Sequence, residues 1–288
     1  MCELDQVNAM GAVNRRQFTA MGAFAAFAAA CSPTSGSAAS DQGLAESMVK
    51  FDAPGGTMDA FFVHPAKGKH PAVIMWPDIA SLRDAFKVMA RRLASAGYSV
   101  IVPNPFYRDA PAPQFADFDA FRKDSGFQKV GPWMAHNTPA AVAETAKAVV
   151  AWLDKQPSVD SKKGIGTQGY CMSGTWTVRT AAAVPGRVKA GGSFHGGNAW
   201  GDGGADSPDA LFAQTKASFL IAQAKNDDAQ KPEVKDAIKK AAEAAGRPAT
   251  VEVYQADHGW MVPDSPVYNE AEANRAWSNL LALYSKSL

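Results

Sequence analysis

Residues 164–174 read GIGTQGYCMSG, a run of glycines and short apolar residues that contains one cysteine, Cys171. The first half is typical of a buried strand, and the small residues on both sides of Cys171 favour a sharp turn from a strand into a helix. This is the pattern of a nucleophile elbow, G-x-S-x-G, with cysteine in place of serine and Ser173-Gly174 in place of the last glycine. We predict that Cys171 is a nucleophile whose thiolate is stabilised by a helix N-terminus; the alternative is a buried structural cysteine.

On both sides of this turn, short apolar runs alternate with stretches of helical spacing. We expect strands at residues 72–76, 99–102, 164–169, 188–193, 219–222 and 250–254, and helices at 82–97, at 139–153, after Cys171, at 234–245 and from Glu270. This alternation predicts an α/β fold with a mostly parallel central sheet and helices on both faces. Residues 110–135 are rich in Pro, Phe and Asp without a clear period, and we interpret them as an excursion over the edge of the sheet, a candidate lid.

Length and composition are those of an ordinary globular protein. The chain has 288 residues, 47% of them hydrophobic and 20% charged, and its formal net charge is +1. These values exclude disordered, collagen-like and coiled-coil chains, and the absence of a basic block argues against a nucleic-acid partner. The three cysteines, Cys2, Cys31 and Cys171, offer the folded part no disulfide framework.

Residues 1–40 resemble an export signal with a linker, and residues 41–288 are then expected to form a single domain. The pair Arg15-Arg16 precedes an apolar run from Ala20 to Ala30, which is shorter than the roughly 20 residues of a membrane span. The paired arginines resemble twin-arginine signals, so we expect an exported, periplasmic bacterial protein.

The processing of this segment has two alternatives. Cleavage before Cys31 predicts a lipid anchor on that cysteine, and cleavage after Ala30 predicts a protein without one. Met10 is also an alternative start to Met1.

Two segments that follow other strands carry the partners that a nucleophilic cysteine needs. Asn226-Asp227-Asp228 follows the strand at 219–222, and His258 follows the strand at 250–254. The C-terminal ends of parallel strands meet at one edge of a sheet, and the chain order nucleophile, acid, histidine suits this kind of elbow. We predict that His258 deprotonates Cys171 and that Asp227 orients the imidazole, with Asp228 as the alternative acid.

An acyl-transfer site also needs N–H donors for the oxyanion. We expect one donor from Met172, which follows the nucleophile, and one from Ile79, in the turn after the strand at 72–76. The side chain of Asp78 would then lie near Cys171, and a helix N-cap is its alternative role.

His195, which lies at a strand end among small residues, is a candidate for lining the substrate pocket. An alternative is a zinc site formed by His195, His258 and Cys171. No paired ligand spacing supports it, so we predict no metal.

Together these features resemble the dienelactone hydrolase family of α/β-hydrolases, from about residue 51 to residue 288. The motifs that carry the resemblance are Gly169-Tyr170-Cys171, Phe194-His195-Gly196-Gly197, Asn226-Asp227-Asp228, His258-Gly259-Trp260, GYSVIVP at 97–103 and PDSPVYN at 263–269. The resemblance implies a triad of Cys171, Asp227 and His258 that hydrolyses esters or lactones without a cofactor. It also implies that Asp78 takes the place of a family glutamate and that Arg108 is a candidate for pairing with a substrate carboxylate.

The sequence therefore predicts a cofactor-free hydrolase of the carboxymethylenebutenolidase type. Its substrate is expected to be a small ester, lactone or thioester, and the protein is expected to be a monomer or a dimer. Two other hypotheses are a catalytically silent small-molecule-binding protein on the same fold and a redox-sensing thiol, which no neighbouring cysteine supports.

Overall fold

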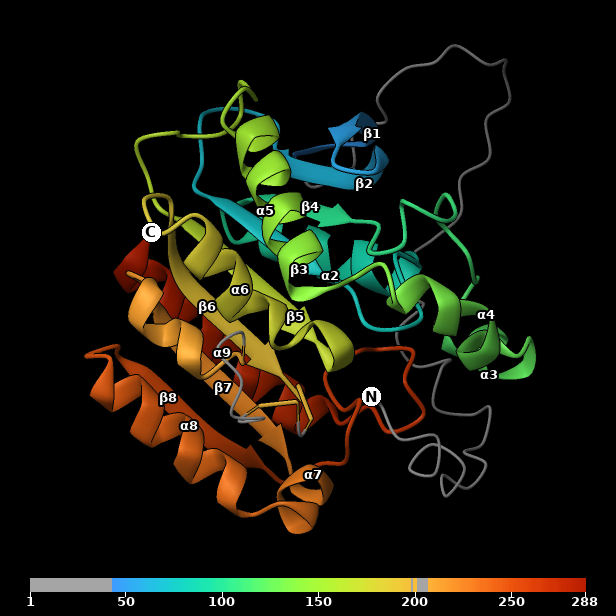
Figure 1. The fold of residues 1–288 in the computed structure, drawn as a ribbon. Helices are drawn as coiled ribbons and strands as arrows, with labels where there is room; N and C mark the ends of the chain where they lie inside the picture. The colour runs from blue at the N-terminus through green and yellow to red at the C-terminus, as the bar shows by residue number, and fades with distance from the viewer. Residues whose placement is uncertain (1–42, 198, 201–206) are drawn as a thin grey trace.

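The computed structural model describes residues 43–197, 199–200 and 207–288 (Figure 1). The predicted export signal, including Met10 and Cys31, lies outside these residues. The strands are β1 Leu44–Ala53, β2 Gly56–Pro65, β3 Ala72–Trp76, β4 Ser99–Pro103, β5 Ile165–Tyr170, β6 Val188–Phe194, β7 Ser218–Ala224 and β8 Ala249–Tyr254. They form an eight-stranded sheet in the order β1-β2-β4-β3-β5-β6-β7-β8.

The sheet is mixed but mostly parallel. Strand β2 pairs antiparallel with β1 and with β4, and every pair from β4 to β8 is parallel. The predicted fold class is therefore confirmed, and the six predicted strands all exist, with ends shifted by at most two residues.

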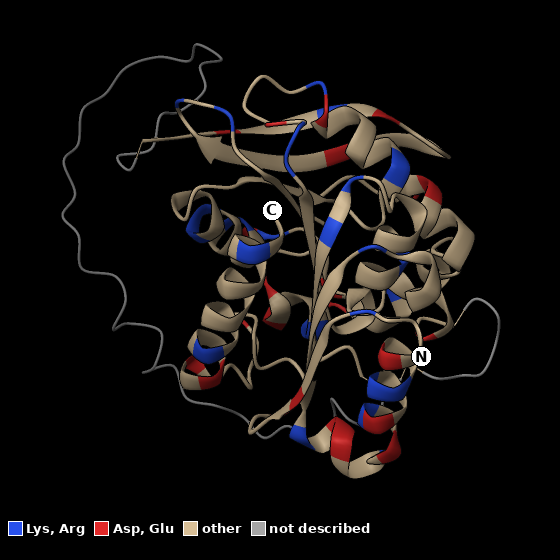
Figure 2. Ribbon diagram, turned by 90° about the vertical axis from the view of Figure 1, so that its left-hand side faces the viewer, with Lys and Arg blue, Asp and Glu red and all other residues tan. Residues whose placement is uncertain are grey.

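Helices cover both faces of the sheet. The longer helices are α2 Asp84–Ser95, α5 Pro139–Leu153, α6 Trp176–Ala183, α8 Glu233–Ala244 and α9 Glu270–Ser287. Helices α2 and α9 pack on one face, and α5, α6 and α8 pack on the other (Figure 1). Figure 2 shows the sheet between these two helical layers, with the charged residues mostly on the helices and loops outside it. Among the described residues, no helix is both long and apolar enough to cross a membrane.

The central strands are apolar on both sides because both sides are covered. All residues of β3, β4 and β5 are buried, which is typical of parallel strands between two helical layers. This burial leaves the C-terminal ends of the strands, where the chain leaves the sheet, as the place for polar side chains.

Three parts of the described chain were not predicted. The hairpin β1–β2 turns at Pro54-Gly55, where Gly55 has φ +90°, and extends the sheet at the antiparallel edge. The excursion at residues 110–135 contains two short helices, α3 Phe118–Lys123 and α4 Gly126–Met134. The segment Asn226-Asp227-Asp228, expected at the end of the strand at 219–222, lies in the short helix α7 Lys225–Gln230.

Candidate active site

Cys171 lies at the junction between β5 and the 3-10 helix η3 Cys171–Ser173, in the left-handed conformation with φ +52°. A Cβ atom on Gly169 would collide with the backbone of Ser173, so glycine is required before the turn. Ser173, which replaces the last glycine of the elbow pattern, is fully buried. Its hydroxyl accepts the N–H of Tyr170 at 2.9 Å and donates to the carbonyl of Trp76 at 2.8 Å. Ser173 thus joins the elbow to the end of β3.

His258 and Asp227 form a hydrogen-bonded pair. The Nδ1 atom of His258 lies 2.7 Å from Oδ2 of Asp227, whose carboxylate is buried in the first turn of α7. The backbone N–H of His258 donates to the side-chain oxygen of Asn226 at 2.8 Å, which fixes the loop that carries the ring. A carboxylate on Nδ1 keeps a proton on that nitrogen and leaves Nε2 as the basic nitrogen of the neutral ring. Asp228, the alternative acid, pairs instead with Lys235 at 2.7 Å.

His195 contacts the nucleophile directly, whereas the sequence predicted a position that lines the substrate pocket. Its side chain is fully buried, and its Nδ1 accepts the backbone N–H of Cys171 at 3.2 Å. Since Nδ1 is an acceptor, the ring proton lies on Nε2, for which the structure gives no hydrogen-bond partner. Burial, and then the nearby charge of His258, hold the pKa of His195 well below its ordinary value. This histidine is therefore neutral at pH 7.

The segment at residues 195–197 lies close to the ring of His258. The imidazole rings of His195 and His258 meet edge to face with their centroids 5.2 Å apart. A Cβ atom on Gly197 would lie 3.5 Å from Cε1 of His258, so Gly197 also lies close to that ring. The structure thus brings Cys171, His195, His258 and Asp227 to one edge of the sheet. Within the described ranges, no group of three or more His, Cys, Asp or Glu side chains is arranged to hold a metal ion.

The turn after β3 contains Ile79, the second predicted oxyanion donor. The N–H of Ala80 donates to the Asp78 carboxylate at 2.9 Å and the N–H of Ser81 to the Asp78 carbonyl at 3.0 Å, so the turn does not use the N–H of Ile79. The side chain of Ile79 belongs to the apolar cluster against which Met172 packs, so the two predicted donors come from neighbouring residues.

Asp78 is held by an arginine that the sequence analysis did not identify. Both carboxylate oxygens of Asp78 accept hydrogen bonds from Arg83, at 2.6 and 2.9 Å, and Arg83 also binds both oxygens of Asp264. The helix N-cap of α2 is Arg83 itself, so the alternative N-cap role for Asp78 was wrong. No sequence signal separates Arg83 from an ordinary surface arginine at a helix start; only its complete burial does.

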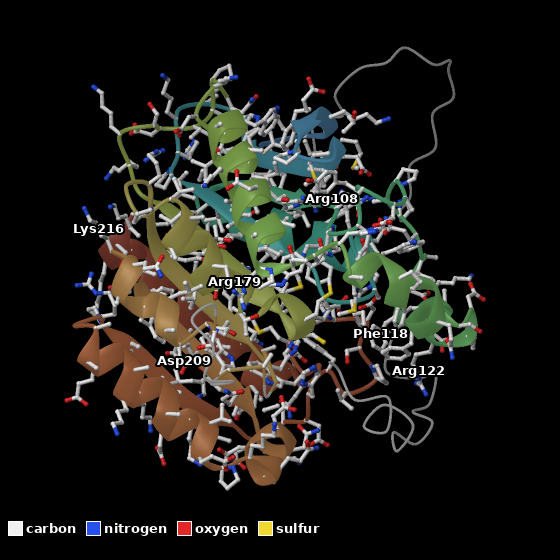
Figure 3. All side chains as sticks on the ribbon, viewed as in Figure 1. Arg108, Phe118, Arg122, Arg179, Asp209 and Lys216 are labelled. Atoms are coloured by element: carbon white, nitrogen blue, oxygen red, sulfur yellow. The ribbon has the colours of Figure 1, made fainter. Side chains whose placement is uncertain are left out.

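Arg108 lies away from these residues. It donates to the hydroxyl of Thr145 at 2.8 Å and lies over the ring of Tyr107 at 4.5 Å. Figure 3 shows it beside the β1–β2 hairpin, apart from Phe118 and Arg122 of α3. The contacts that the structure gives for Arg108 include none of the residues of the elbow or of the His258–Asp227 pair.

Comparison with known proteins is consistent with this geometry. The model of the "Dienelactone hydrolase family" matches residues 58–288. A Synechocystis protein named "Putative carboxymethylenebutenolidase" is 25% identical over 232 residues, which cover 77% of this chain and 89% of that protein. A protein of the same name from Methylorubrum extorquens is 26% identical over 286 residues, covering 96% and 94%. A crystal structure described as "Putative Dienelactone Hydrolase", from Klebsiella pneumoniae, has a TM-score of 0.71 at 22% identity and covers 84% of this chain and 99% of its own. The last of these similarities shows a shared fold.

Proposed function

Because the chain belongs to the dienelactone hydrolase family, we propose that it hydrolyses an ester, lactone or thioester through Cys171, His258 and Asp227, without a cofactor. The observation that carries the proposal is the 2.7 Å pair of His258 and Asp227 at the edge of the sheet where Cys171 takes the left-handed conformation of an elbow. A base oriented by a carboxylate beside a strained nucleophile is the arrangement that covalent acyl transfer needs.

The proposed reaction has two halves. Nε2 of His258 accepts the proton of the Cys171 thiol, and the thiolate attacks the substrate carbonyl to give a tetrahedral intermediate. The N–H groups of Met172 and Ile79 stabilise the oxyanion, and His258 returns the proton to the leaving alkoxide or thiolate, which leaves an acyl thioester on Cys171. His258 then deprotonates a water molecule, whose oxygen attacks the thioester carbonyl and releases the acid, and the thiol is regenerated.

The test is steady-state hydrolysis of 4-nitrophenyl acetate and of small lactones by the wild-type protein and by Cys171→Ala. We expect turnover that falls by roughly a thousandfold or more in the variant. Asp227→Asn and Asp228→Asn form a matched pair on α7. The first should reduce kcat strongly, and the second should change it by less than about threefold, because Asp228 pairs with Lys235. Turnover that does not depend on Cys171 contradicts the proposal, and no turnover by the wild-type protein favours the binding-protein hypothesis.

We also propose that residues 1–40 direct export to the periplasm and that Cys31 is a candidate lipid-anchor site. The support is the sequence pattern alone, Arg15-Arg16 before an apolar run that is followed by Cys31. Fractionation of the tagged full-length chain in a bacterium with a twin-arginine pathway tests export. The double variant Arg15→Lys, Arg16→Lys should keep the protein in the cytoplasm, and equal periplasmic amounts would contradict the proposal. Mass spectrometry of the mature N-terminus distinguishes an acylated Cys31 from cleavage after Ala30.

A further inference from the structure

The guanidinium of Arg83 has no N–H left for a ligand. Its five N–H groups donate to both oxygens of Asp78, to both oxygens of Asp264 and to the carbonyl of Ser81, all at 2.6–3.1 Å. The guanidinium also lies over the rings of Phe86 and Phe118, at 5.1 and 5.6 Å. Although Arg83 is a buried cation next to the Ile79 turn, it is saturated by the protein.

This ion cluster carries an excess of negative charge. Asp78 and Asp264 bring two carboxylates against one guanidinium, and Oδ2 of Asp264 additionally accepts the backbone N–H of Phe118 at 3.0 Å. Burial raises the pKa of Asp78, against the opposing effect of Arg83. A further carboxylate placed nearby would meet repulsion and would find no donor on Arg83.

Arg108, the second candidate for binding a substrate carboxylate, makes its contacts away from the catalytic residues. Arg108 donates to the Thr145 hydroxyl and stacks on Tyr107 beside the β1–β2 hairpin (Figure 3). Lys225, next to Asn226 at the start of α7, is exposed and lies 3.6 Å from the carboxylate of Asp257. In the described part of the chain, Lys225 is thus the cation nearest in sequence to the triad acid, and it is included in the test below.

The side chains that pack next to the two oxyanion donors are apolar instead. Ile79 belongs to a buried cluster with Ala80, Phe106, Phe115, Phe121 and Val130, and Met172 packs against it. Its aromatic members come from the α3–α4 excursion and from the segment after β4, and Phe121 meets Phe115 and Phe127 edge to face at 5.0 and 4.7 Å. The interior beside the two donors therefore consists of hydrocarbon and aromatic rings.

Arg83 has all its N–H groups bound by the protein, Arg108 lies away from the catalytic residues, and apolar side chains pack next to the oxyanion donors. We therefore propose that the site selects neutral esters with an apolar acyl group and discriminates against acyl groups that carry a carboxylate. The proposal rests on the hydrolase function proposed above and names its substrate class. It departs from the expectation that Arg108 pairs with a substrate carboxylate.

The test compares two esters that differ only in charge, methyl 4-nitrophenyl adipate and mono-4-nitrophenyl adipate, with 4-nitrophenyl 3-phenylpropanoate as an aromatic, neutral third substrate. We expect kcat/KM for the neutral adipate to exceed that for the anionic one by about tenfold or more, and the aromatic ester to be at least as good as the neutral adipate. Equal values, or a preference for the anionic ester, overturn the proposal. If that preference is lost in Lys225→Met or Arg108→Met, the variant identifies the residue that binds the carboxylate.

The outcome also separates this proposal from the hydrolase function. If none of the three esters is hydrolysed, the function fails, but both adipates remain intact and can be used as ligands. Their protection of Cys171 against alkylation by iodoacetamide then measures the charge preference directly. Stronger protection by the neutral ester supports the proposal, and equal or stronger protection by the anionic ester overturns it.

Discussion

Two residues with positive φ, Cys171 at +52° and His195 at +39°, face each other across the ends of β5 and β6. Residues other than glycine adopt this backbone conformation at a cost of order 1–3 kcal/mol, so surrounding contacts must hold them in it. The bond from the Cys171 N–H to Nδ1 of His195 is one such contact, and the bond from the His195 N–H to the carbonyl of Ala222 is another. His195 is therefore expected to position the nucleophile without touching the substrate.

Replacing His195 tests this role. His195→Asn keeps an oxygen acceptor close to the place of Nδ1, and His195→Leu has a similar size without an acceptor. We expect the alkylation rate of Cys171 at pH 7 to fall about tenfold or more in the Leu variant and to stay within about threefold in the Asn variant, because only Leu leaves the N–H unpaired. Equal alkylation rates for wild type and the Leu variant, both folded by circular dichroism, would show that the bond does not position Cys171.

The buried, neutral His195 also predicts a pH dependence of stability. Burial, and then the charge of His258, lower its pKa well below the ordinary value of 6.5. Below pH 6.5 the unfolded chain binds a proton at this residue and the folded protein does not, so stability decreases as the pH falls, by up to about 1.4 kcal/mol per pH unit. Urea unfolding at about pH 7, 6 and 5 should show a smaller decrease for His195→Asn than for wild type. Parallel decreases would contradict a neutral His195 in the folded protein.

At the scale of elements, Arg83 connects three segments around the site. It binds Asp78 in the turn after β3 and Asp264 in the loop after His258, and Asp264 in turn accepts the N–H of Phe118 at the start of α3. The turn that contains Ile79, the loop after His258 and the α3–α4 excursion are thus joined through one buried guanidinium. This explains why the excursion is ordered although its sequence has no helical period.

Arg83→Met should therefore destabilise the protein by about 3–5 kcal/mol, because it leaves the buried carboxylate of Asp78 and the partly buried carboxylate of Asp264 without their partner. Arg92→Met is a matched control on the same helix, since Arg92 lies at the surface over the ring of Trp277 at 4.4 Å. It should cost less than about 1 kcal/mol. The free energy of unfolding in urea measures both, and similar values for the two variants would contradict the role of Arg83 as a buried connector.

The elements that the sequence predicted are those whose pattern is local. Strands β3 to β8 are apolar runs bounded by turn residues, and Thr138 and Asn269 cap α5 and α9 through their side chains, as their positions indicate. The missed helices α3 and α4 are too short to show a period, and they are stabilised by contacts with distant segments, such as Phe118 with Asp264. The hairpin β1–β2 does have a sequence signal, because the dipeptide Pro54-Gly55 is typical of a turn.

At the scale of the whole molecule, the parallel order of β5, β6, β7 and β8 brings together residues that are far apart in the chain. Cys171 follows β5, His195 follows β6, Asp227 follows β7 and His258 follows β8, all at one edge of the sheet. The identity of these candidates was predictable because strand ends and residue types are visible in the sequence. Three other features depend on side-chain packing, which the sequence does not encode locally. Arg83 binds Asp78, Arg108 binds Thr145, and His258 pairs with Asp227 and not with Asp228.

The central claim, that His258 activates Cys171, is tested most directly by the pH dependence of the alkylation rate of Cys171 in wild type and in His258→Ala. The account predicts a rate in wild type that is already high below pH 7, and a rate in the variant that rises only near the free-thiol pKa of about 8.5. A wild-type rate that rises only near that pKa and is unchanged in His258→Ala would contradict the account.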